Sequence, residues 1–222
     1  MKNFTLLIAA TMLFTVVKTN AQEDLTQECT IKYNLFSGDI KSKKYDDAYL
    51  NWIFLFEKCP DLSVNIYKYG STLAEEVRKD PALAKKVYEQ RLQYFPNDNP
   101  AKVHSDYADY LYNNKLASDE EIFEILQKAY KISPKDMSVK NIYKYFQGVT
   151  DKFKDNDPKR VFDTYDDVIE SIGEKLDDYT TKINELTKDS TKVLDERQKR
   201  SLNAYQINSG ALGQIEEGLD NI

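Results

Sequence analysis

Apolar residues recur at intervals of three and four along most of this chain, a spacing that predicts amphipathic helices. No segment shows the strict alternation of a strand. Several helix starts are marked by an N-cap acceptor before a proline or by a capping box: Asp80-Pro81, Asn99-Pro100, Asp157-Pro158, and Ser118 with Glu121. With breaks at Lys41 to Lys44 and at Pro60, these signals divide residues 25 to 154 into seven helices of roughly 14 to 20 residues.

A longer period runs through the same region. Three prolines each follow a small or aliphatic residue by twelve positions and a bulky residue by eight: Ala48, Trp52, Pro60; Ala84, Tyr88, Pro96; Ile122, Leu126, Pro134. The leading residues are 36 and 38 positions apart. That period is typical of stacked helix pairs.

The first helix of each pair carries a small residue between an aromatic and an aliphatic one, as close approach of two helices requires: Phe36-Ser37 with Ile40, Tyr69-Gly70 with Leu73, Tyr107-Ala108 with Leu111. Together the two series resemble three tetratricopeptide repeats (TPRs) over residues 25 to about 134. The resemblance implies an all-α, TPR-like solenoid of helical hairpins over residues 22–157. Three features depart from the motif. The turns in the second and third repeats are longer than the family norm, Arg91 stands where a small residue usually packs, and Gly173 takes the proline's place in a fourth unit.

Residues 158–222 carry longer apolar stripes: Ile172, Leu176, Tyr179, Ile183 and Leu186, then Val193, Tyr205, Leu212, Ile215 and Leu219. They predict two long amphipathic helices. A break in the heptad between Ile172 and Leu176 favours an intramolecular hairpin over an oligomeric coiled coil. The second stripe is still apolar at the last residues of the sequence. We therefore expect a continuation in a longer protein, or self-association through residues 158–222.

Residues 1–21 have the pattern of a secretory signal peptide. Fourteen uncharged residues, Phe4 to Val17, follow Lys2 and precede Thr19-Asn20-Ala21. The alternative, an uncleaved anchor, needs roughly 20 apolar residues. No cysteine lies at the cleavage point, so no lipid anchor is indicated. We expect a periplasmic, cell-surface or secreted protein with no membrane insertion after cleavage.

Removal of the leader changes the formal charge from −6 to −8, with 29 basic and 37 acidic side chains remaining. An acidic surface without a basic block argues against nucleic-acid partners and anionic lipid. The two cysteines, Cys29 and Cys59, lie near the same end of the first predicted hairpin. An oxidising compartment favours a disulfide between them, and two buried thiols are the alternative.

The sequence offers little for catalysis. The single histidine, His104, lies at a position that normally packs, and nucleophile–base, phosphate-loop and metal-binding motifs are absent from the sequence. Three adjacent carboxylate pairs point about 100° apart on a helix and do not converge: Asp46-Asp47, Glu120-Glu121 and Asp177-Asp178. We expect no enzymatic activity, cofactor or metal.

In the TPR family the first helices line a concave groove that receives a peptide or a partner helix. Offsets from Ser37, Gly70 and Ala108 select the candidate groove residues: Asn34, Gly38, Lys41, Tyr67, Ser71, Ala74, Glu75, Lys102, Ser105, Asp109, Tyr112 and Asn113. The resemblance implies a non-enzymatic scaffold that binds a protein or peptide partner in the cell envelope.

The junction Asn20-Ala21-Gln22 and a composition rich in Tyr, Asn and Lys are similar to those of exported periplasmic TPR proteins of Bacteroidota. Sixteen tyrosines leave an alternative, a carbohydrate-binding helical-repeat protein of a glycan uptake system. Against it, the only tryptophan, Trp52, occupies a core position of the repeat, and we expect most tyrosines to be packing residues.

Overall fold

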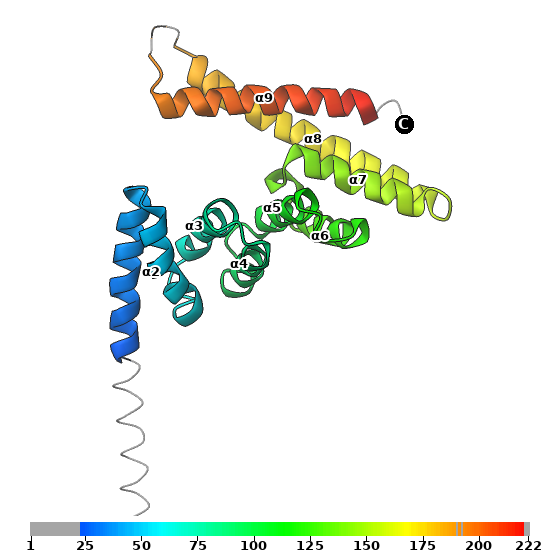
Figure 1. Cartoon of the computed structure of the whole chain (residues 1–222). Coiled ribbons are helices and arrows are strands. Elements are labelled where there is room, and N and C mark those ends of the chain that lie inside the picture. Colours follow the sequence, from blue (N-terminus) through cyan, green and yellow to red (C-terminus); the bar gives the residue numbers. More distant parts are fainter. Residues whose placement is uncertain (1–22, 190, 192, 220–222) are drawn as a thin grey trace, which may run out of the picture. The chain divides into compact units, whose positions relative to one another are not determined.

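The computed structural model describes residues 23–189, 191 and 193–219, with side chains described up to residue 215. The described chain consists of α-helices, one π-helical segment and one 3-10 turn, with no strand among the described residues (Figure 1). The all-α prediction is therefore confirmed. None of the described helices is both long and apolar enough to span a membrane. The predicted signal peptide, residues 1–21, lies outside the described residues, as do residues 220–222 at the end of the chain.

The chain divides into two compact units, one ending at Asp98 and one beginning at Asn99. The first unit contains two helical hairpins. One pairs the helix at residues 23–41 with α2 (Tyr45–Lys58). The other pairs α3 (Asn65–Thr72), which continues as the π-helical segment η1 (Leu73–Val77), with α4 (Pro81–Tyr94). These bounds agree with the first four predicted helices.

A disulfide between Cys29 and Cys59 joins the two helices of the first hairpin, as predicted, and the two Cα atoms are 6.0 Å apart. Both cysteines are buried. The bridge lies opposite the turn at residues 42–44, so both ends of this hairpin are closed.

Trp52 is the centre of the first unit's core. It is fully buried, its Nε1 donates a hydrogen bond of 2.7 Å to the carbonyl oxygen of Ile66, and its ring stacks on Phe56. The glycine predicted to permit a close helix approach, Gly70, lies directly against the indole. A Cβ atom at Gly70 would be 2.7 Å from Trp52 Nε1, so no larger residue fits here without movement. The core position predicted for Trp52 is confirmed.

The second unit contains α5 (Pro100–Asn113), α6 (Asp119–Ile132), the 3-10 turn η2 (Pro134–Asp136), α7 (Val139–Phe153), α8 (Pro158–Thr187) and α9 (Glu196–Leu219). Each helix packs against the next one along the chain, and α9 also contacts α7. The predicted boundary between residues 157 and 158 lies inside this unit, where α7 packs on α8.

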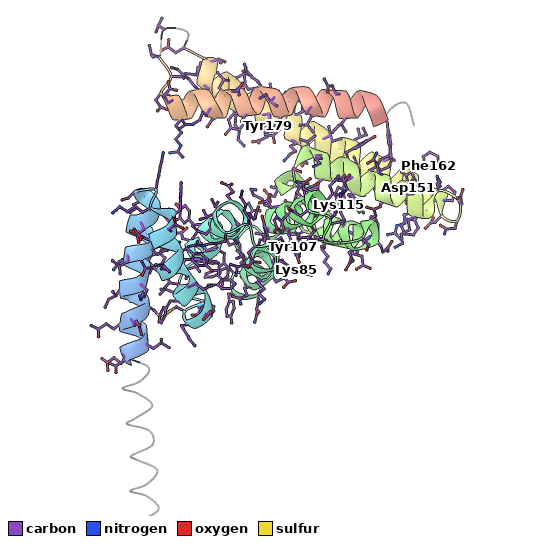
Figure 2. All side chains as sticks on the ribbon, viewed as in Figure 1. Lys85, Tyr107, Lys115, Asp151, Phe162 and Tyr179 are labelled. Atoms are coloured by element: carbon purple, nitrogen blue, oxygen red, sulfur yellow. A yellow bond between two sulfur atoms is a disulfide. The ribbon has the colours of Figure 1, made fainter. Side chains whose placement is uncertain are left out.

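The two long helices after residue 158, α8 and α9, form a hairpin through residues 188–195 (Figure 1). Tyr179, labelled in Figure 2, stacks on Tyr205 with ring centroids 5.8 Å apart. Ile172 and Leu212 are fully buried, whereas Val193 in the connection is exposed. The two stripes therefore meet at Tyr179 and Tyr205, and the side chain of Leu219 lies outside the described residues.

Three of the four predicted N-caps are confirmed. The side chains of Asp80, Ser118 and Asp157 each accept a hydrogen bond from a backbone N–H in the first turn of their helix, and Ser118 forms the capping box with Glu121. Asn99 was wrongly predicted as a cap. Its φ is 52°, and a side-chain cap bond normally requires an extended backbone at this position.

The turns of three successive hairpins each contain a lysine with left-handed backbone: Lys43 (φ 57°), Lys79 (φ 52°) and Lys115 (φ 56°). They are spaced by 36 residues, and Lys115 is labelled in Figure 2. Glycine or asparagine normally occupies such positions because a Cβ atom disfavours them. The sequence repeat therefore extends to the backbone conformation of the turns.

Candidate partner-binding face on α5 and α7

In the first unit, the candidate groove residues serve mainly as internal contacts. Tyr67 was predicted to face a partner, and this is wrong: it is only 1% exposed. Its hydroxyl donates 2.8 Å to the carbonyl oxygen of Pro60, and its ring packs edge-on against Phe56 and Phe95. Burial raises the pKa of the Tyr67 phenol, which therefore stays neutral and acts as a hydrogen-bond donor.

The neighbouring candidates divide between buried and exposed positions. Glu75 accepts a hydrogen bond of 3.0 Å from the Tyr88 hydroxyl on α4, and the Ser71 hydroxyl donates to the carbonyl oxygen of Lys68. Ala74 is buried, whereas Asn34, Gly38 and Lys41 on the first helix are exposed. No compact site forms from the candidates of this unit.

Among the α5 candidates, Ser105 was also predicted to face a partner, and it is fully buried instead. Asn141 on α7 donates from Nδ2 to both the carbonyl oxygen and the hydroxyl of Ser105, each at 2.9 Å. The Ser105 hydroxyl also accepts from the backbone N–H of Ser138, the N-cap of α7. Ser105 therefore fixes the start of α7 against α5.

Two of the α5 candidates, Asp109 and Tyr112, form a cluster with two lysines of α7. Lys140 Nζ lies 3.4 Å from Asp109 Oδ1 and 5.7 Å from the Tyr112 ring centroid. Lys144 Nζ lies 2.9 Å from the same centroid. We call these four residues the α5–α7 cluster. Tyr112 is 47% exposed and the Lys140 side chain 54% exposed, so the cluster is open to a partner.

Lys144 is the most constrained member of the α5–α7 cluster. Its Nζ is buried and has no hydrogen-bond partner among the described residues. Burial, with the nearby Lys140 ammonium, lowers the pKa of Lys144. An ammonium has three N–H donors, and a ring face satisfies them only in part.

The other α5 candidates lie beside this cluster. Lys102 is exposed and forms an ion pair of 2.7 Å with Asp106 one turn along α5. Asn113 is exposed at the last turn of the helix. The structure therefore brings together Asp109 and Tyr112 and leaves Lys102 and Asn113 outside the cluster.

Sequence reasoning missed Lys140 and Lys144. The repeat motif was followed only to about residue 134, so α7 was not treated as a first helix. A signal was present nonetheless: Ser138 caps α7, and two lysines four residues apart share one face of it. Extending the hairpin pattern by one helix would have placed both lysines beside α5.

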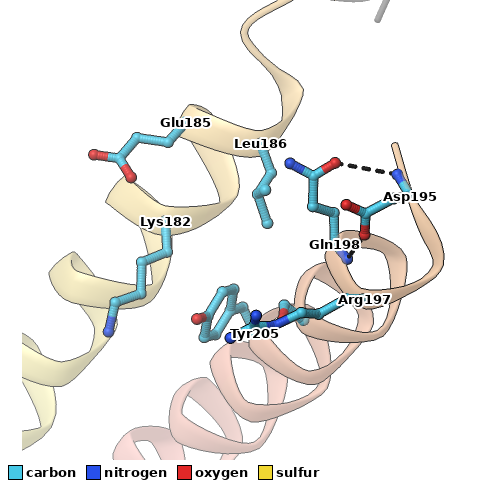
Figure 3. A pocket seen from close by; sticks show the side chains of 8 residues that line it. Lys182, Glu185, Leu186, Asp195, Arg197, Gln198 and Tyr205 are labelled. Atoms are coloured by element: carbon cyan, nitrogen blue, oxygen red, sulfur yellow. Dashed lines mark hydrogen bonds between the residues drawn. The ribbon is translucent and has the colours of Figure 1, made fainter. Parts of the chain in front are cut away.

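A second feature is a polar pocket of about 360 Å³ between the end of α8 and the start of α9 (Figure 3). Figure 3 shows Lys182 and Glu185 on one wall, and Arg197 and Tyr205 on the other. At its edge the side chains and backbone N–H groups of Asp195 and Gln198 cap α9 reciprocally. The walls of this pocket carry both positive and negative side chains, so it can hold a small polar molecule.

His104 and the adjacent carboxylates do not assemble into a reactive group. His104 is partly buried, its Nδ1 has no hydrogen-bond partner, and burial together with Lys128 lowers its pKa. Members of the carboxylate pairs have separate partners: Asp46 with Arg78, Glu120 with Lys152, and Asp178 with Lys182. The described part of the chain contains no group of three or more metal-ligating side chains.

Comparisons of this chain with protein-family models, with curated proteins and with solved structures give no match.

Proposed function

We propose that this chain is a non-enzymatic scaffold of the cell envelope, built on TPR-like helical hairpins, that binds a protein or peptide partner. The helix arrangement supports this proposal. In the first unit, Phe36 on the first helix contacts Tyr69 on α3 at 6.2 Å between ring centroids. In the second unit, Ser105 on α5 is bonded to Asn141 on α7. In both units the first helices of successive hairpins are therefore neighbours, as in helical-repeat scaffolds.

The observation that carries the proposal is the α5–α7 cluster. A half-exposed tyrosine with adjacent lysines is a combination typical of interface anchors: the ring supplies apolar area, and the ammonium groups pair with acidic groups. The cluster has two cations and one carboxylate, although the chain as a whole has a net charge of −6. The partner segment that fits best has a carboxylate next to an apolar side chain.

The envelope location rests on the disulfide and on the predicted leader. A buried disulfide that closes a hairpin forms and persists in an oxidising compartment. The uncharged stretch Phe4 to Val17 has the pattern of an export signal. Both features favour a partner that is also exported.

The proposal is tested by affinity capture from an envelope extract of the organism that encodes the chain. Three forms are compared: wild type, the double variant Tyr112→Ala/Lys140→Gln, and the control Lys152→Gln. Lys152 has matching chemistry elsewhere on α7, because it lies 5.2 Å from the Phe123 ring and pairs with Glu120. Tyr112 and Lys140 are about half exposed, so the double variant should keep its helicity and melting temperature.

We expect the double variant to capture at least tenfold less partner than wild type. The control should capture as much partner as wild type. Equal capture by all three forms would contradict the α5–α7 cluster as the binding face. If the wild-type protein retains envelope oligosaccharides but no protein, and the double variant loses them, the carbohydrate-binding alternative replaces the proposal.

A further inference from the structure

The second unit contains a cavity of about 450 Å³ that is separate from the α5–α7 cluster. Its walls come from the start of α5, from η2 and from the middle of α8. The lining residues include Lys102, Lys135, Asp136, Lys175 and Tyr179. A cavity of this size accommodates a small molecule.

Lys175 is the unusual residue of this cavity. It is only 8% exposed, although it lies in the middle of a long surface helix. Its Nζ donates one hydrogen bond, to the carbonyl oxygen of Lys135, and lies 5.6 Å from the Tyr179 ring centroid. Among the described residues, no carboxylate lies within 4.0 Å of it. Two N–H donors of a buried ammonium are therefore left for another group.

An ammonium in this position is costly without an anion. Burial lowers the pKa of Lys175, and the nearby Asp136 and Asp178 carboxylates offset this only in part. A buried ammonium with no carboxylate in direct contact destabilises a fold, and an apolar residue of similar length would pack at least as well. A lysine that lines a cavity is instead suited to bind an anion that enters from solvent.

The remaining wall residues restrict which anion fits. Lys102, Lys135 and Lys182 add positive charge, but Asp136, Glu174 and Asp178 also line the cavity, and Asp178 is paired with Lys182. These carboxylates repel a phosphate dianion. They can instead accept hydrogen bonds from the hydroxyl or ammonium groups of a ligand that has a single carboxylate.

We infer that this cavity binds a small monocarboxylate, either a sugar acid or an amino acid, with Lys175 as the group that pairs with its carboxylate. The Tyr179 ring covers the apolar face of the ligand. The site is distinct from the proposed partner-binding face, because Lys102 precedes Asp109 by seven residues, roughly 10 Å along α5.

The test is calorimetric titration of the full chain without its leader. The probes are D-glucuronate, D-galacturonate, L-alanine and inorganic phosphate. Lys175→Met removes the charged Nζ and keeps an unbranched side chain of nearly the same length. Lys102→Gln/Lys135→Gln changes only rim ammonium groups and does not threaten folding. Lys140→Met, on the α5–α7 cluster, is the matched control.

We expect millimolar or tighter binding of at least one carboxylate probe. Affinity should fall at least tenfold in Lys175→Met, at least threefold in the rim variant, and not at all in Lys140→Met. Binding of the uronates alone assigns a sugar acid, and binding of alanine alone assigns an amino acid. The inference is overturned if no carboxylate binds at 10 mM, if phosphate binds more tightly than the carboxylates, or if folded Lys175→Met binds as tightly as wild type. Should Lys175→Met not fold, wild-type affinity in the rim variant overturns it.

Discussion

The ammonium of Lys144 on α7 lies 2.9 Å from the ring centre of Tyr112 on α5. This contact connects the exposed part of two helices whose buried part is connected by the Asn141–Ser105 hydrogen bonds. The same helix pair therefore has a structural contact near the start of α7 and a half-exposed, chemically distinct contact further along. The buried contact of Asn141 with Ser105 stabilises the second unit, whereas the half-exposed ring of Tyr112 is available to a partner.

Gly70 and Gly38 provide a direct test of the first unit's core. A Cβ atom at Gly70 would clash with the Trp52 indole, so Gly70→Ala should destabilise the protein by about 1 to 3 kcal/mol. A Cβ atom at Gly38 would meet no other part of the fold within 4 Å, so Gly38→Ala should raise stability by up to about 1 kcal/mol. Urea unfolding measures both, and equal effects would contradict the packing.

At the lysines with left-handed backbone, we expect substitution by glycine to raise the stability of the protein. Lys79→Gly and Lys115→Gly should each raise the free energy of unfolding by about 0.5 to 1 kcal/mol, because glycine adopts positive φ without a Cβ penalty. Lys86→Gly, at an exposed position inside α4, should lower it by about 1 kcal/mol. Thermal melting distinguishes the two cases. A loss of stability at all three positions would mean that the turns are not left-handed.

The Cys29–Cys59 disulfide should contribute about 3 to 4 kcal/mol, because it restricts a loop of this length in the unfolded chain. Cys29→Ser/Cys59→Ser should lower the urea midpoint accordingly, as should a reductant on the wild-type protein. Mass mapping of exported material without reductant should show one intramolecular bridge. Two free thiols, or a midpoint unaffected by the double substitution, would contradict its structural role.

Tyr130 should make stability fall at alkaline pH. Burial raises the pKa of Tyr130 to about 12, with Asp167 and Tyr145 adding to the shift. Since the folded-state pKa exceeds the ordinary value of 10, the phenol's contribution is complete below pH 10 and is lost between pH 10 and 12. A pKa raised from 10 to about 12 corresponds to about 3 kcal/mol at most. Tyr130→Phe should flatten this part of the profile, whereas Tyr69→Phe, on an exposed ring, should leave it as in wild type.

Much of the fold could be predicted because local signals agree with packing. Asp80 and Asp157 cap helices where their sequence indicated, and the small residue Gly70 marks a real close approach to Trp52. Arg91 departs from the repeat, and the structure supplies the reason. Its guanidinium pairs with Asp98 at 2.7 Å, where burial alone would raise the pKa of Asp98 but the hydrogen bonds from Arg91 and Lys68 lower it.

The candidate site was harder to predict. Whether a side chain faces a groove or is buried depends on residues that are far away in the sequence. Tyr67 and Ser105 occupy the same offset from Gly70 and Ala108, and both are buried: one by Phe95 after α4, the other by the start of α7. Lys144 is 32 residues from Tyr112, so no local pattern connects them. The π-helical segment η1 likewise left no recognisable signal in the sequence.

The central claim is that the α5–α7 cluster contacts a protein partner, and site-specific photo-crosslinking tests it most directly. The photoreactive residue benzoylphenylalanine replaces Tyr112 in one sample and Ile132, which is 50% exposed at the end of α6, in a control. Both proteins are exported and irradiated in intact cells. We expect a discrete protein adduct from position 112, reduced by Lys140→Gln, and none from position 132. The same adducts from both positions, or no protein adduct from position 112, would contradict the account.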